Sequence, residues 1–300
     1  SSSDLANNES YSKTFAQAED RARVLTFLNQ KGGVGKTTMA YHTARALKEQ
    51  GQKVLCLDMD PQANLSLLFG IDTDVTGKSH IYQLLVNSVR ELKTLHTPVL
   101  WSEVVESVEG LDVIPAGQEL SGFELSVASI NTPRQLVLKK FLEKSGLINE
   151  YDCIVIDAPP TVGLLVVNIL CASDGILIPF KPDDFSRKGL THLNDVLLDI
   201  EDMGVTKVPE VLAHIPNLVD ARRRQEGLDL QKIADEMSDL QHVGRGKVMS
   251  PFYNRATLAR CQSQRKTVYD YQAKDFRALQ QQFNMLAGLI QEWAKERSCV

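Results

Sequence analysis

The sequence has 300 residues, of which 43% are hydrophobic and 24% charged, a balance that is typical of globular domains and not of disordered chains. Its net charge of −5 argues against a protein that coats nucleic acid with its whole surface, although it is compatible with a local basic patch. No apolar run approaches the roughly 18–20 residues that a membrane span requires, and the polar N-terminus lacks the hydrophobic core of a secretory signal. We therefore expect a soluble, cytosolic, globular protein.

The cysteines are odd in number and widely scattered, at Cys56, Cys153, Cys171, Cys261 and Cys299. Two of them lie inside apolar runs that look like strands, and no pair has the spacing of metal ligands. We therefore expect reduced thiols in the core rather than disulfides or a metal site.

The first 22 residues are polar, and we interpret residues 1–22 as a flexible or peripheral arm. From Val24 onward, aliphatic and β-branched runs predict six buried strands, at 24–28, 54–57, 111–114, 153–156, 175–178 and 211–215. A helical pattern over 36–50, stopped by Gly51, separates the first two. Because the runs are continuous rather than alternating, both faces of each strand are expected to be covered, as in a parallel sheet. We predict one doubly wound α/β domain over residues 23–300, with a mostly parallel sheet and helices on both faces.

The turn after the first predicted strand is rich in glycine and reads Lys31-Gly32-Gly33-Val34-Gly35-Lys36-Thr37-Thr38. It fits the usual P-loop pattern only in part, since Asn29 or Gln30 stands where the first glycine belongs and Lys31 is added. Glycines let backbone N–H groups converge on phosphate oxygens, and the following helix adds its dipole. Lys36 would neutralise the β- and γ-phosphates, and Thr37 would bind Mg²⁺. A chance glycine-rich turn is the alternative, but its place between a strand and a helix favours a phosphate loop.

This loop resembles the deviant Walker A motif of the ParA/MinD superfamily of P-loop ATPases, and the resemblance extends from Val24 to Trp293. It implies ATP and Mg²⁺ as cofactors, with residues 31–38 around the phosphates. In that superfamily the added lysine, here Lys31, reaches across an ATP-bridged homodimer to the partner's phosphates and stabilises the charge on the transferring phosphoryl group. Without the surrounding motif, Lys31 would be interpreted as a solvated loop lysine.

Carboxylates follow two of the predicted strands, at the sheet edge where open α/β folds bind ligands. Asp58 and Asp60 follow the second strand, and Asp157 follows the fourth. A Mg²⁺–phosphate partner explains them better than chance, because an uncompensated buried carboxylate is unfavourable. The position of Asp157 suits a Walker B metal ligand, with helix capping as the alternative. By the resemblance, Asp60 orients the attacking water, and Asp58 supports the metal shell and the loop.

Other parts of the nucleotide site follow from the resemblance alone. It makes Gln62 and Asn64 switch residues, although turn chemistry after Pro61 explains them equally well. It also places Asn217 and Pro251 where the superfamily contacts adenine.

The C-terminal third is richer in basic residues than the centre of the chain, where 101–126 holds six acidic side chains and no Lys or Arg. With the ParA resemblance, this asymmetry favours salt-sensitive DNA binding through phosphates rather than base edges; a solvated surface is the alternative. The candidate DNA contacts are Arg222, Arg255, Arg260, Arg265 and Lys266.

Apolar residues recur at helical spacing from Phe276 to Trp293. This stripe bears on whether the chain resembles the MinD branch of the superfamily, whose members bind membranes. A membrane-targeting helix would surround such a stripe with Lys and Arg, whereas the intervening residues here are largely Gln. We therefore expect a helix packed on the sheet and no membrane partner. The cysteine spacing likewise excludes the nitrogenase-type iron–sulfur branch.

The ParA resemblance implies a slow ATPase in the cytoplasm that dimerises on Mg·ATP, binds nucleoid DNA non-specifically and drives plasmid or chromosome partition. A ParB-like centromere-binding protein would stimulate its hydrolysis. One alternative is the same ATPase with another cargo, such as carboxysomes or chemoreceptor clusters. The other is a nucleotide-gated regulator in which hydrolysis is incidental.

Overall fold

The computed structural model describes residues 21–29, 31, 33, 35–220, 222, 227–253 and 255–298, the side chains of Arg255 and Ser298 excepted. Residues 1–20 of the predicted arm lie outside this description. At its end, Arg21 pairs with Asp174 at 2.6 Å, and Ala22 is fully buried with its N–H 2.6 Å from the Ile148 carbonyl. The chain is thus anchored to the fold from Arg21 onward.

Eight strands form one sheet in the order β3-β4-β2-β5-β1-β6-β7-β8. All neighbours pair in parallel except β3 and β4, which pair antiparallel at one edge. The strands are β1 (Arg23–Phe27), β2 (Val54–Asp58), β3 (Glu106–Val108), β4 (Leu111–Ile114), β5 (Cys153–Asp157), β6 (Gly175–Phe180), β7 (Glu210–Pro216) and β8 (Lys247–Val248). Strands β2 to β5 lie on one side of β1 and strands β6 to β8 on the other, so a topological switch point falls beside the carboxyl end of β1, where such sheets bind ligands.

The described helices connect these strands and cover both faces of the sheet. The α-helices are α2 (Lys36–Glu49), α3 (Asn64–Leu68), α4 (Ile81–Ser88), α5 (Trp101–Val104), α6 (Phe123–Ser126), α7 (Val137–Lys144), α8 (Leu164–Ala172), α9 (Arg187–Met203), α11 (Leu230–Met237), α12 (Arg255–Ser263) and α13 (Lys274–Ser298). Short 3₁₀ helices are η1 (Lys93–Leu95), η2 (Gln118–Gly122), η3 (Arg134–Leu136), η4 (Leu147–Asn149), η5 (Pro182–Asp184), η6 (Val243–Arg245) and η7 (Val268–Asp270).

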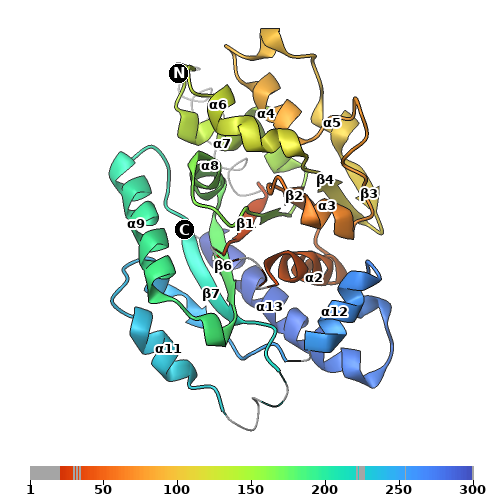
Figure 1. Ribbon diagram of the computed structural model, residues 1–300, viewed down its shortest axis with the longest axis vertical. Helices are drawn as coiled ribbons and strands as arrows, with labels where there is room; N and C mark the ends of the chain where they lie inside the picture. The colour runs from red at the N-terminus through yellow and green to blue at the C-terminus, as the bar shows by residue number, and fades with distance from the viewer. Residues whose placement is uncertain are drawn as a thin grey trace, which may run out of the picture.

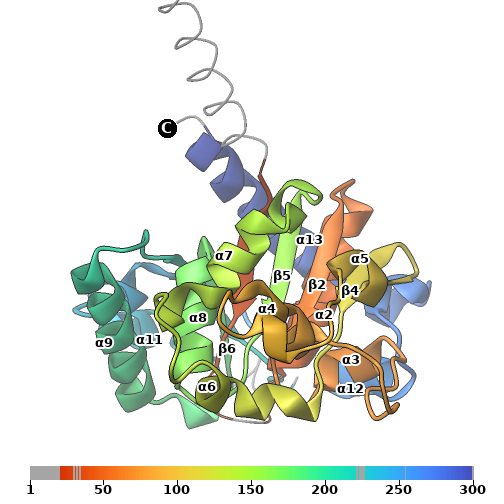
Figure 2. The same cartoon turned by 90° about the horizontal axis from the view of Figure 1, so that it is seen from above.

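Two hydrophobic cores lie on opposite faces of the sheet (Figure 1). The first packs α4, α7, α8 and α9 against one face; in Figure 2, α4, α7 and α8 stand in front of the strands and α9 stands at the left. The second packs α2, α12 and α13 against the other. Within it, the stripe on α13 from Phe276 to Trp293 is buried, with Leu279, Phe283 and Leu286 wholly inaccessible to solvent. The prediction of a packed C-terminal helix is therefore confirmed. Across the described residues, no helix has the length and apolarity to cross a membrane.

The six predicted strands and the predicted doubly wound sheet are confirmed, with β1, β2 and β5 buried almost throughout. The sequence analysis missed two strands, β3 and β8, which lie at opposite edges of the sheet. Both are short and partly exposed, so they lack the continuous apolar run that marks the central strands. Four cysteines are buried free thiols as expected, and Cys299 lies outside the described residues.

Candidate functional site: a phosphate loop at the switch point

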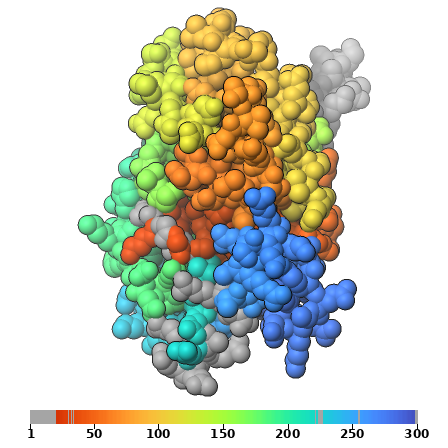
Figure 3. Space-filling view, turned by 45° about the vertical axis from the view of Figure 1, so that its right-hand side comes forward, coloured from red at the N-terminus to blue at the C-terminus, as the bar shows by residue number. Residues whose placement is uncertain are grey.

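A cleft of about 460 Å³ opens at the carboxyl end of β1, where the glycine-rich turn leads into α2. Residues from five parts of the chain line it: Lys31, Gly33, Gly35, Lys36, Thr37, Thr38, Asp60, Gln62, Asn64, Pro160, Leu218, Leu258, Ala259 and Gln262. In Figure 3 the blue C-terminal segment lies directly beside the red and orange N-terminal third on one face of the molecule. The described part of the predicted phosphate loop thus forms one wall of the cleft, and Gly32 and Val34 lie outside the described residues.

Gly35 caps the N-terminus of α2 with a left-handed backbone (φ 77°), which glycine adopts without strain. A Cβ at this position would also collide with the side-chain amide of Asn217, which is fully buried. Asn217 is held in turn by its own N–H, which donates to the Phe180 carbonyl at 2.8 Å. The loop therefore leaves its backbone N–H groups and the helix N-terminus close to whatever occupies the cleft.

At the base of the cleft, Lys36 forms a buried ion pair with Asp157, the last residue of β5. The Thr37 hydroxyl donates to the other oxygen of the same carboxylate at 2.8 Å. Burial raises the pKa of Asp157, while Lys36 and Thr37 oppose that shift by stabilising its charged form. The predicted phosphate-binding lysine, the predicted Mg²⁺-binding hydroxyl and the predicted Walker B aspartate are thus in direct contact.

Asp58 and Asp60 have different surroundings although they are two residues apart. Asp58 is fully buried and accepts hydrogen bonds from the Ser66 N–H at 2.9 Å, the Ser66 hydroxyl at 2.7 Å and the Asp60 N–H at 3.1 Å. Burial and the neighbouring Asp157 carboxylate raise the pKa of Asp58 to about 7. These bonds tie the loop after β2 to α3, in line with the predicted support of the loop. Asp60 instead lines the cleft, and one of its oxygens accepts the Gln62 N–H at 3.0 Å.

Lys31 is exposed and lines the cleft, with its ammonium 3.4 Å from the Asp184 carbonyl oxygen. A second lysine lies nearby: the Lys181 ammonium is 4.0 Å from where a Cβ on Gly33 would stand. Both lysines also line an adjacent cavity of about 90 Å³. The sequence analysis missed Lys181, because only the register of β1 against β6 brings it to the phosphate loop.

Leu218 and Leu258 form apolar walls of the cleft, where an aromatic base can pack. Of the two predicted adenine contacts, Asn217 precedes Leu218 and contacts the phosphate loop as described. Pro251 is buried, and its carbonyl accepts a hydrogen bond from the Gln282 amide at 2.8 Å. The sequence analysis did not single out Gln262, whose side-chain oxygen accepts the Thr38 hydroxyl at 3.1 Å.

Three of the predicted DNA contacts lie together at the end of α12, and we call Arg260, Arg265 and Lys266 the α12 basic cluster. All three are exposed. The Arg260 guanidinium and the Lys266 ammonium lie 5.8 Å and 5.7 Å from the centre of the Tyr271 ring. Arg265 has a left-handed backbone with φ 53°. Arg255 begins α12, and Arg222 is exposed on the loop after β7.

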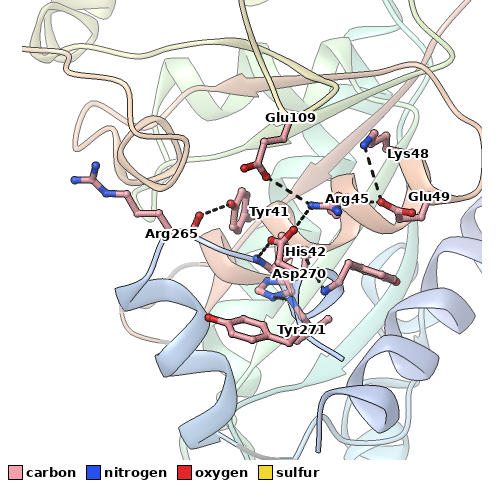
Figure 4. A network of polar contacts seen from close by, with 12 residues as sticks. Tyr41, His42, Arg45, Lys48, Glu49, Glu109, Arg265, Asp270 and Tyr271 are labelled. Carbon is pink, nitrogen blue, oxygen red and sulfur yellow. Dashed lines mark hydrogen bonds and ion pairs between the residues drawn. The ribbon is translucent and has the colours of Figure 1, made fainter. Parts of the chain in front are cut away.

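An acidic residue borders this cluster. Glu109, from the acidic stretch in the centre of the chain, lies 3.8 Å from Arg45 of α2, and both line a small cavity that Arg265 also lines (Figure 4). The acidic and basic stretches of the sequence therefore meet in space at this point.

The AAA_31 family, described as an AAA domain, matches residues 22–208. The chain is similar to the chromosome partitioning protein ParA of Caulobacter vibrioides, with 37% identity over 171 residues, which are 57% of this chain and 60% of that protein. The chain thus spans about three fifths of the length of this curated relative.

Among solved structures, cobyrinic acid a,c-diamide synthase from Mycobacterium smegmatis with bound ADP and magnesium has 28% identity and a TM-score of 0.61, over 73% of this chain and 81% of that one. McdA from Cyanothece in complex with ATP has a TM-score of 0.74 over 90% and 97% of the two chains, and at 20% identity it shows a shared fold. These matches agree with the order of the strands, with the phosphate loop and its added lysine, and with the contact between Lys36 and Asp157. The chain belongs to the AAA_31 family, within the ParA/MinD superfamily of P-loop ATPases.

Proposed function

We propose that the protein is a ParA-type partition ATPase that dimerises on Mg·ATP, binds DNA non-specifically and is stimulated by a ParB-like centromere-binding protein. The contact of Lys36, Thr37 and Asp157 at the base of a phosphate-loop cleft carries this proposal. The chromosome-partitioning name of the Caulobacter relative supports the biological role. We further propose that residues 23–300 act as one ATPase domain and that the protein works in the cytoplasm on the nucleoid.

The side chains present fit ATP and Mg²⁺. Gly35 sits where any Cβ would collide with Asn217, so the loop backbone stays open to phosphate oxygens. Lys36 would exchange part of its ion pair with Asp157 for the β- and γ-phosphates, and Thr37 would turn its hydroxyl oxygen toward the metal. Asp157 would hold the metal through its water shell, with Asp58 behind it. The relative with bound ADP and magnesium supports this pair of cofactors.

In the hydrolytic step, the side chains of the protein would orient the attacking water and stabilise the charge on the phosphates. Mg·ATP supplies the transferable phosphoryl group and the charge of the metal. Asp60 lines the cleft with one carboxylate oxygen held by the loop, so its other oxygen can orient a water molecule. Lys31, exposed at the rim, would reach the phosphates of the partner subunit in the dimer.

DNA would bind through phosphates on the α12 basic cluster, together with Arg222 and Arg255. The cluster joins two cations around one aromatic ring, which holds them close together at the surface. Since contacts to phosphate displace counterions, affinity would fall steeply with salt and depend little on sequence.

A DNA-binding titration tests this function. A labelled non-specific duplex is titrated without nucleotide and with ADP, ATP or a slowly hydrolysed ATP analogue, between about 50 and 200 mM salt. We expect binding with ATP or the analogue, a log-linear loss with salt, and a dimer by sedimentation in the same two nucleotide states. Arg260→Glu is expected to weaken binding, while Lys232→Glu, an exposed substitution on α11, serves as the matched control. Binding that ignores the nucleotide would contradict the partition cycle, and a flat salt response would contradict the phosphate contacts.

A further inference from the structure

One face of α2 is tied along its length to residues 262–270, which lie more than 220 positions away in the sequence. The four residues of α2 on this face are spaced as i, i+3, i+4 and i+7, so they share one side of the helix. Their partners follow in the same chain direction, giving the pairs Thr38–Gln262, Tyr41–Arg265, His42–Val268 and Arg45–Asp270.

Three of these ties are fixed by burial or charge, as Figure 4 shows from close by. The Tyr41 hydroxyl donates to the Arg265 carbonyl at 3.2 Å, and Arg45 pairs with Asp270 at 3.0 Å. His42 is fully buried, and its Nε2 accepts the Val268 N–H at 3.1 Å. The segment that carries Arg265 and Lys266 therefore rests on the helix whose N-terminus forms the phosphate site.

The fourth tie, at the cleft, is different. Thr38 is in the first turn of α2, and its hydroxyl donates to the Gln262 side-chain oxygen at 3.1 Å. Gln262 is exposed and lines the cleft, two residues after Arg260 on α12. A threonine hydroxyl has one hydrogen to donate, so Gln262 and a phosphate oxygen would compete for it. If a phosphate oxygen takes that hydrogen, the Gln262 amide is released and can donate its own N–H to the ligand.

We propose that Gln262 is a positioning residue that contacts the bound nucleotide and couples it to the α12 basic cluster. The tie to Thr38 exists without nucleotide and is exchanged for a contact to the ligand, which gives α12 two alternative arrangements at the cleft. Gln262 belongs to the same helix as Arg260, and Arg265 follows directly after it. The coupling to DNA rests on the proposed function, whereas the contact to nucleotide does not.

Two substitutions at Gln262 test the contact to nucleotide and the coupling to DNA binding separately. Gln262→Leu keeps the size of the side chain but removes its hydrogen bonds, and Gln262→Glu places a negative charge against the phosphates. Gln231, exposed on α11, provides the matched controls Gln231→Leu and Gln231→Glu. ATP affinity and the ratio of DNA affinities with and without the ATP analogue are measured for all variants, and thermal unfolding shows that each is folded.

We expect Gln262→Glu to weaken ATP binding about tenfold, equivalent to about 1.4 kcal/mol. We expect Gln262→Leu to reduce the ATP-dependent gain in DNA affinity at least about threefold, with nucleotide-free DNA binding unchanged. The controls are expected to match the unaltered protein. Unchanged ATP affinity in Gln262→Glu together with a full gain in Gln262→Leu would overturn the proposal. If the unaltered protein binds no DNA in any nucleotide state, the proposed function fails, and Gln262→Glu still tests the nucleotide contact.

Discussion

Lys36 and Asp157 form an ion pair that is shielded from solvent at the end of β5, 121 residues apart in the sequence. Each group makes the other's charge tolerable in the interior, and the Thr37 hydroxyl satisfies the second carboxylate oxygen. The same three groups are the ones a nucleotide and its metal would engage. The pair therefore holds the site in shape before any ligand arrives.

Lys36→Gln is expected to abolish ATP binding, because the amide carries no charge to balance the phosphates. It also leaves the buried Asp157 carboxylate without its cation, so we expect a loss of about 3 kcal/mol in the free energy of unfolding. Fluorescent-nucleotide titration and denaturant unfolding measure the two effects, with Lys295→Gln at the exposed end of α13 as control. Adding Asp157→Asn is expected to restore part of the stability and none of the binding; a double variant as unstable as Lys36→Gln would argue against charge as the cause.

Asp60→Ala is expected to bind ATP and DNA like the unaltered protein. Its rate of ATP hydrolysis is expected to fall by at least about a hundredfold, because the carboxylate that orients the water is lost. Steady-state phosphate release, with the nucleotide affinity measured in parallel, checks this. Turnover at the unaltered rate would remove Asp60 from its proposed role.

Asp58→Ala is expected to act on stability rather than turnover alone. It removes the acceptor of three hydrogen bonds and leaves the buried N–H groups of Ser66 and Asp60 unsatisfied. We expect a loss of about 3 kcal/mol in the free energy of unfolding, measured by denaturant titration. Equal stability of Asp58→Ala and Asp60→Ala would contradict the different surroundings of the two carboxylates.

His42 predicts an acid-sensitive fold. Burial lowers its pKa from 6.5 to about 4 in the native state, where Nδ1 bonds the Thr38 carbonyl, Nε2 accepts from Val268, and Arg45 and Asp270 lie nearby. Because the native pKa is below the unfolded one, the unfolded chain takes up the proton first as the pH falls. The contribution of His42 to the free energy of unfolding is complete above pH 6.5. It falls by about 3 kcal/mol as the pH decreases to about 4.

Urea unfolding across that pH range, compared with His42→Gln, isolates this group from the other buried histidines. The variant is expected to be less stable at pH 7, since it loses the stacking of the ring on Phe283, but to show a shallower decline toward acid pH. Parallel pH profiles for the two proteins would contradict the assignment.

Arg265→Gly and Arg260→Gly form a matched pair, because each removes one cation of the α12 basic cluster. Arg265 has φ 53°, where glycine is free of strain, so Arg265→Gly is expected to stabilise the fold by about 1 kcal/mol. Arg260 lies within α12, so Arg260→Gly is expected to destabilise it by about 1 kcal/mol. Both are expected to weaken DNA binding and reduce its salt slope by about 1. Opposite shifts in melting temperature with similar losses of DNA affinity are the result to look for.

Local patterns in the sequence were sufficient for the centre of the fold and for most of the cleft. A continuous apolar run such as 153–156 predicts a strand buried on both faces, and the glycine-rich turn before Lys36 predicts a phosphate loop, because each depends on neighbouring residues only. The edge strands β3 and β8 escaped prediction because pairing at an edge needs little apolar surface.

The position of Lys181 near the phosphate loop and the hydrogen bond between Gln262 and Thr38 could not be predicted in the same way. They arise from the pairing of β1 with β6 and from the seating of α12 beside α2, and neither residue has a local pattern that distinguishes it. The Gln262 contact spans 224 positions, so only the folded structure reveals it.

The covering of α2 also sets an order of events during synthesis. Its apolar side packs on residues such as Phe252, Val268 and Phe283, which are made more than 200 residues later. At about 5–20 residues per second, a ribosome needs on the order of ten seconds or more to reach them. During that time α2 can pack on sheet residues such as Leu25 and Val54, but it lacks the part of the second core that covers its other side. The nascent chain can therefore cover this side of α2 completely only near the end of its synthesis, and a chain truncated before Phe252 leaves it partly exposed.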